Sequence, residues 1–101
     1  MSTIVVRHTV KDFNTWKPYY DEHALARDRY GIRDDGVYRG ASDPNNVVLV
    51  FQTDDYEKAR EFFDSDDLRE TMQKAGVVSA PTIWVTDGAR VDSRSNLVTS
   101  S

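Results

Sequence analysis

The sequence predicts an α+β domain with the element order βαββαβ, a ferredoxin-like arrangement in which an antiparallel four-stranded sheet carries its helices on one face. Runs rich in β-branched residues recur four times along the chain. Apolar residues at helical spacing fill the long intervals after the first and third runs. The length of 101 residues and the absence of cysteine fit one domain that folds without disulfides.

The first half of the chain supplies two predicted strands and one helix. Residues 2–10 are mostly β-branched and predict the first strand. Asp12 is placed to cap a helix that we expect over residues 13–30, and Gly31 is placed to end it. Residues 32–40 predict a second, more polar strand that is ordered only in its second half. The residues that recur at helical spacing are Phe13, Trp16, Tyr20, His23 and Arg27.

The second half of the chain repeats this pattern. Residues 47–53 predict the most apolar strand, which pairs in a hairpin with the strand before it. A helical segment starts at Asp54 or Asp55 and ends at Gly76, with a break midway. Residues 81–87 predict the last strand. We therefore expect the first and third strands, which are the most apolar, to lie in the centre of the sheet.

We expect residues 1–87 to form the single domain and residues 88–101 to form a disordered C-terminal tail. The tail is rich in Ser, Asp, Arg and Thr and has no hydrophobic period. The formal net charge of −4 argues against a nucleic-acid partner. No apolar run approaches the roughly 18 residues of a membrane span, so we expect no membrane insertion. A cytoplasmic location fits the absence of cysteine.

The third predicted strand is apolar on both faces. Strand alternation places Leu49 and Phe51 on one face and Val48 and Val50 on the other. The helices cover only one face, so the other exposes an apolar patch that is typical of an interface. A two-fold homodimer is the simplest cover for such a face.

Five segments of the chain carry a resemblance to a known superfamily. They are Val6-Arg7-His8-Thr9-Val10, Trp16–His23, the turn Asp43-Pro44-Asn45 with the strand Val47–Phe51 after it, the helix Asp66–Met72, and Ala75-Gly76-Val77. With the βαββαβ order, these segments resemble the dimeric α+β barrel superfamily, in particular small proteins described as antibiotic-biosynthesis-monooxygenase-like or as cyclases. The resemblance covers residues 2–87. It implies a dimeric barrel in which two sheets pack together.

The resemblance implies several activities. The superfamily includes cofactor-free quinone-forming monooxygenases, polyketide cyclases, haem-degrading enzymes and lactone isomerases. In members of the monooxygenase type, oxygen reacts with the carbanion of the substrate, so the protein needs only to deprotonate, orient and exclude water. Haem-degrading relatives use an axial histidine in the second helical region, and residues 55–76 contain no histidine. Haem binding is therefore disfavoured, and no cofactor is expected.

Two histidines are the candidate catalytic residues. His23 lies on the predicted inward stripe, and an imidazole can act as acid or base near neutral pH. His8 lies on the strand face that we assign to the helices, so it is placed to meet His23 across a cavity. The alternative is a structural histidine bonded to a carbonyl or a carboxylate. A two-histidine, one-carboxylate metal site is disfavoured, because no single element offers the spacing. The candidate substrate-binding residues are Trp16, Tyr20, Tyr38 and Trp84.

The sequence thus favours a small cofactor-independent enzyme, similar to a monooxygenase or a cyclase. It would act by proton transfer, with His23 as the transferring group, on a small apolar molecule that is aromatic or polyketide-like. The alternative is a non-catalytic dimeric protein that binds a ligand or serves in stress, with the same cavity and no reaction. The two differ in whether His23 faces a solvent-connected cavity or is sealed in the core.

Overall fold

Residues 1–86 of the chain are described by a computed structural model. In chain order they form β1 (Ser2–Thr9), α1 (Phe13–Glu22), α2 (Ala24–Arg29), β2 (Ile32–Arg39), β3 (Asn46–Thr53), α3 (Tyr56–Phe63), α4 (Asp66–Ala75) and β4 (Thr82–Val85). The predicted βαββαβ order is confirmed, with each helical region divided into two helices. The expected tail over residues 88–101 lies outside the described residues, as does residue 87.

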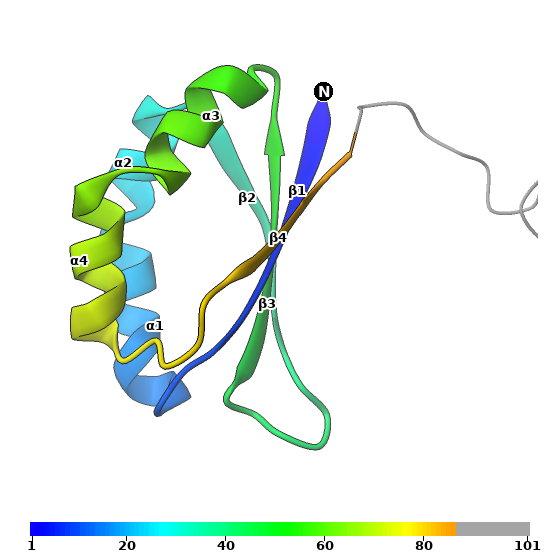
Figure 1. Cartoon of the computed structure of the whole chain (residues 1–101). Coiled ribbons are helices and arrows are strands. Elements are labelled where there is room, and N and C mark those ends of the chain that lie inside the picture. Colours follow the sequence, from blue (N-terminus) through cyan, green and yellow to red (C-terminus); the bar gives the residue numbers. More distant parts are fainter. Residues whose placement is uncertain (87–101) are drawn as a thin grey trace, which may run out of the picture.

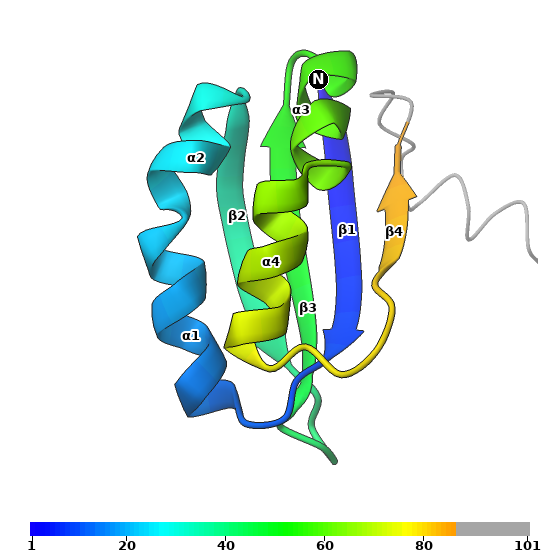
Figure 2. The same ribbon diagram turned by 60° about the vertical axis from the view of Figure 1, so that its left-hand side comes forward.

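The strands form one antiparallel sheet in the order β2-β3-β1-β4, so the two most apolar strands are central, as predicted. β1 and β3 pair along their whole length, from Ser2 opposite Thr53 to Thr9 opposite Asn46. All four helices of the described chain lie on one side of this sheet (Figure 1). In Figure 2, α1 and α2 run along the side of β2, α4 lies over the middle of the sheet, and β4 forms the far edge.

Strand alternation divides the side chains of the two central strands between the core and the outer face. Ile4, Val6 and His8 of β1 are buried towards the helices, whereas Arg7 is exposed on the outer face. The same alternation buries four residues of β3 under the helices. The hydrophobic core consists of Ile4, Val6, Val10, Trp16, Ile32, Val47, Leu49, Phe51, Ala59, Phe62 and Ala75.

The helices α1 and α3 begin at the predicted caps. The carboxylate of Asp12 accepts a hydrogen bond from the N–H of Thr15 at 3.1 Å, and that of Asp55 accepts one from Lys58 at 3.2 Å. These bonds satisfy N–H groups that the first turn of a helix leaves free. The longest helices, α1 and α4, have 10 residues each, and no helix within residues 1–86 is long and apolar enough to cross a bilayer.

Two predictions of element bounds are corrected. The helix expected over residues 13–30 is interrupted at His23, whose ψ of 4° departs from the helical value of about −42°. His23 fits the helical spacing, so the sequence carried no signal of this break. The second strand is ordered from Ile32 rather than in its second half alone, because Ile32 is buried and pairs with Thr53. The polar part of this strand contains a β-bulge, where the pairing register shifts between Asp34 and Gly36.

The outer face of the sheet carries an apolar patch beside Arg7 and is not covered by any element of the described chain. Trp84 is 74 % exposed and Tyr38 is 58 % exposed, while Val48 and Val50 are half-buried between them. The ring of Tyr38 lies over Gly36, where a Cβ atom would stand 2.6 Å from a ring carbon. A patch of this kind is typical of an interaction surface.

Gly76 ends α4 in the left-handed conformation, with a φ of 85°. A Cβ atom at this position would stand 3.4 Å from the Cβ of Lys11, which is ordinary contact, so a substitution acts through the backbone. We expect Gly76→Ala to lower the free energy of unfolding by about 1–2 kcal/mol. Gly76→Asn should cost less, because asparagine tolerates this conformation. Chemical denaturation measures both, and an alanine variant as stable as the wild type would contradict the prediction.

Candidate functional site between the helices and the sheet

A mainly apolar cavity of about 80 Å³ lies between the helices and the sheet. Every layer of the fold contributes to its wall. The principal lining residues are Val6, His8, Trp16, Tyr20, His23, Arg27, Leu49, Phe51, Phe62, Leu68, Met72 and Ile83. Pockets that hold drug-sized ligands usually measure about 300–1,000 Å³, so a ligand with an aromatic ring enters this smaller cavity only when its wall moves.

The structure brings together four of the six residues that the sequence singled out. His8, His23, Trp16 and Tyr20 all line the cavity, where helical spacing and strand alternation predicted them to meet. Tyr38 and Trp84 do not line it. They pair with Val48 and Val5, so the alternation of the sheet turns them to the outer face.

His8 is buried in the cavity wall without a hydrogen bond. Its side chain belongs to a residue that is 4 % exposed, and neither ring nitrogen has a partner within residues 1–86. The ring meets Trp16 edge-on, with 5.6 Å between centroids. Burial lowers the pKa of His8 below its ordinary value of 6.5, because the charged form loses its hydration. The imidazole is therefore neutral near pH 7, with one nitrogen free to accept a proton and one N–H to donate.

Tyr20 brings a second unsatisfied polar atom to the cavity. Its hydroxyl is buried and makes no hydrogen bond to the rest of the described chain. Its ring lies 5.2 Å from that of Trp16, measured between centroids. Burial raises the pKa of Tyr20 to about 12; the nearby Asp34 carboxylate adds to this rise, and the charge of Arg27 opposes it. The phenol therefore keeps its proton and can donate a hydrogen bond to a ligand.

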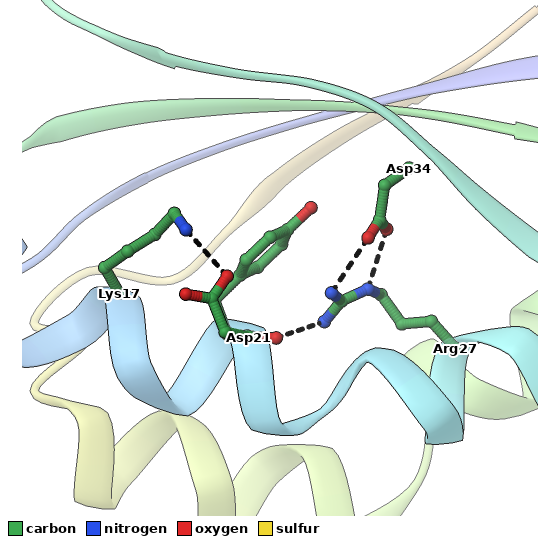
Figure 3. Close-up of polar contacts among 5 residues, drawn as sticks. Lys17, Asp21, Arg27 and Asp34 are labelled. Atoms are coloured by element: carbon green, nitrogen blue, oxygen red, sulfur yellow. Dashed lines mark hydrogen bonds and ion pairs between the residues drawn. The ribbon is translucent and has the colours of Figure 1, made fainter.

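Arg27 lines the cavity with a guanidinium whose three nitrogens each donate one hydrogen bond. Its Nε and Nη2 donate to the two carboxylate oxygens of Asp34 at 2.8 and 3.0 Å, and its Nη1 donates to the carbonyl of Tyr20 at 2.8 Å. Figure 3 shows this arrangement, with the Lys17–Asp21 pair on the preceding helix, α1. The guanidinium also lies 3.9 Å from the centroid of the Tyr20 ring. These contacts fix the ring, since a planar guanidinium both stacks and bonds in a fixed geometry.

His23 is paired with an acidic residue that the sequence analysis did not identify. Its Nε2 lies 2.8 Å from the Oδ2 of Asp67 in the first turn of α4, and its ring contacts Phe62 at 5.5 Å between centroids. The side chain of His23 is 15 % exposed and that of Asp67 is 74 % exposed. The pair therefore joins the break between α1 and α2 to α4 at the solvent side of the cavity. Nothing in the local sequence marks Asp67 as a partner, because 44 residues separate the two.

The two histidines do not belong to a metal-binding cluster in the part of the chain that the structure describes. Within residues 1–86, no group of three or more histidine, aspartate, glutamate or cysteine side chains is placed to hold an ion. In the described part of the chain, Asp67 supplies the one carboxylate bonded to either histidine, and it orients His23.

No protein-family model and no curated protein matches the sequence. Solved structures do match. SnoaB from Streptomyces nogalater, described as a cofactor-independent oxygenase, has a TM-score of 0.69 at 15% identity, over 89% of this chain and 94% of that one. A putative antibiotic biosynthesis monooxygenase from Caulobacter crescentus has a TM-score of 0.69 at 10% identity, over 88% and 90%. A conserved protein from Methanosarcina mazei has a TM-score of 0.65 at 16% identity, over 84% and 89%.

These matches identify the class of fold. The chain has the α+β fold of the antibiotic-biosynthesis-monooxygenase-like proteins, as the resemblance in the sequence predicted. At identities of 10–16% the likeness establishes the fold alone, and the activity has to be argued from the cavity.

The burial of His8 predicts a specific dependence of stability on pH. Its pKa is lowered in the folded protein, so below about pH 6.5 the unfolded chain takes up a proton that the folded protein does not. Unfolding is therefore favoured as the pH falls. We expect the wild type to lose more stability between pH 7 and pH 5 than His8→Phe. Denaturant titrations at both values measure this loss, and equal losses in the two proteins would contradict the prediction.

Proposed function

We propose that the protein is a small enzyme that transfers protons to and from a small apolar ligand bound in this cavity, in the manner of a cofactor-independent monooxygenase or cyclase. The observation that carries the proposal is His8, a buried neutral imidazole with both ring nitrogens free of partners among residues 1–86. A buried polar group without a partner is costly, so its place in the wall of a cavity favours a role towards a ligand. The description of SnoaB as a cofactor-independent oxygenase supports the same class.

Each residue of the cavity wall has a separate role in this proposal, which follows from its surroundings. His8 accepts a proton from a phenol or an activated C–H, and the electron pair stays on the substrate. Tyr20 donates a hydrogen bond to the oxygen on which negative charge develops, as an oxyanion donor does. Trp16 touches both rings and provides the flat apolar surface between them. His23, oriented by Asp67, can exchange a proton with solvent because the pair reaches the surface.

A non-catalytic ligand-binding protein remains the second candidate. The same cavity with the same unsatisfied atoms would also hold a ligand that is not transformed. The two candidates differ in whether a bound molecule with an activated C–H exchanges its hydrogen.

We expect the protein to accelerate the exchange of the C1 protons of 2-tetralone with solvent deuterium, which NMR follows directly. His8→Phe should reduce the accelerated rate by about 10²–10⁴-fold, the usual contribution of a positioned acid or base. His23→Phe tests the second histidine in the same assay. Tyr20→Phe should also lower the rate, whereas Tyr56→Phe, on the partly exposed start of α3, should not.

Binding of 2-tetralone without exchange in the wild type would favour the non-catalytic candidate. A rate that is the same in the wild type and in His8→Phe would remove His8 from the reaction. If His23→Phe alone abolishes exchange, the base is His23.

The resemblance and the outer face of the sheet together support a homodimer. Trp84 and Tyr38 are largely exposed there beside a row of half-buried valines. A second copy of the chain, packing the same face by a two-fold axis, would cover both patches at once.

The dimer has a direct test. Light scattering from a chromatographed sample at micromolar concentration should give about twice the mass of one chain. Trp84→Asp would place a charge on the outer face and should yield monomers, whereas Tyr56→Asp on the helix side should not. A wild-type protein that elutes as a monomer would contradict the proposal.

A further inference from the structure

The charge of the cavity wall depends on a single ion pair. Of the residues that line the cavity, all within the described chain, Arg27 alone carries a permanent charge. The carboxylate of Asp34 does not line the cavity. It neutralises the guanidinium of Arg27 through two hydrogen bonds of 2.8 and 3.0 Å. The net charge that a ligand meets at this end of the cavity is therefore close to zero.

We propose that Asp34 determines which ligands the cavity accepts: by occupying Arg27, it reserves the cavity for uncharged molecules that bind through hydrogen bonds to His8 and Tyr20. This inference rests on the proposed use of the cavity for a small molecule. Beyond the proposed function, Asp34 is a residue that determines specificity, and the ligand belongs to the class of uncharged molecules.

The reasoning follows from the cost of burying charge. An anion that enters an apolar cavity loses its hydration and needs a counter-charge. Arg27 is the group placed to supply one, and its Nε and Nη2 are already bonded to Asp34. Asp34 is 43% exposed, so water reaches its carboxylate while the Arg27 side chain is only 5% exposed. The carboxylate thus neutralises Arg27 from the solvent side without entering the cavity.

A neutral ligand does not carry this cost of losing the hydration of a charge. The ring nitrogens of His8 and the hydroxyl of Tyr20 offer donors and acceptors that have no other partner in the described chain. A molecule with polar atoms and no charge can satisfy them, and it brings no ion to be desolvated. The cavity therefore favours an amide, a ketone or a protonated phenol over a carboxylate of the same shape.

Benzamide and benzoate test this preference, because they share size and shape and differ in charge at pH 7. NMR titrations follow the indole N–H signal of Trp16 in the cavity wall, and the signal of Trp84 on the outer face serves as an internal control. We expect the wild type to bind benzamide at least about tenfold more tightly than benzoate. Equal affinities, or tighter binding of benzoate, would overturn the inference. This comparison uses the wild-type protein, so it does not depend on the folding of any variant.

The second part of the experiment removes the negative charge that neutralises Arg27. Asp34→Asn keeps the shape of the side chain and removes its charge, so benzoate should gain about tenfold in affinity while benzamide changes little. Asp54→Asn is the matched control: it raises the net charge equally, but its partner, Arg33, is exposed and does not line the cavity. If Asp34→Asn and Asp54→Asn increase the affinity for benzoate by the same factor, the inference is overturned.

The outcomes separate this inference from the proposed function. If neither probe binds the wild type at any concentration tested, the cavity is not a small-molecule site and both proposals fail. If both probes bind without discrimination, only the role of Asp34 fails. If the expected discrimination is found while His8→Phe leaves deuterium exchange unchanged, the role of Asp34 stands and the catalytic role of His8 fails.

Discussion

The register of β1 against β3 is the constraint on which the cavity depends. These strands occupy the centre of the sheet and pair from Ser2 opposite Thr53 to Thr9 opposite Asn46. Side chains alternate along a strand, so a slip by one residue would exchange its two faces. Such a slip would carry His8 out of the cavity and drive Arg7 into the core. The apolar side chains that face the helices make that register far more stable than its neighbours, and they thereby fix the position of the imidazole.

The cavity contains polar groups that a fold selected for stability alone would not retain. An unsatisfied buried donor or acceptor costs about 1–3 kcal/mol, and His8 and Tyr20 each bring such atoms to an apolar wall. Arg27, by contrast, is as deeply buried as His8 and donates a hydrogen bond from each of its three nitrogens. One group of buried polar side chains thus completes its bonds within the protein. The other leaves its bonds open to whatever enters, which is typical of a site rather than of a core.

The sequence predicted the fold and part of the site. Strand alternation and helical spacing placed His8, Trp16 and Tyr20 correctly, because both periods depend on the backbone alone. The break at His23 was missed because His23 fits the helical spacing, and its partner Asp67 lies 44 residues away in the chain. Asp34 was missed for a similar reason: it lies in a strand whose polar stretch forms a bulge, and only the tertiary structure brings it to Arg27. Tyr38 and Trp84 were assigned to ligand binding by their chemistry, and the pairing of their strands turned them away from the cavity.

The interruption between α1 and α2 has a consequence for how such a protein can diversify. In one continuous helix, each inserted residue would rotate everything beyond it by about 100°. Here the piece that carries Trp16 and Tyr20 ends at His23, and a separate short piece carries Arg27 to β2. The aromatic surface and the charged end of the cavity are thus modules joined at a junction. Changes in the second module can alter the polarity of the cavity while Trp16 in the first keeps its packing in the core.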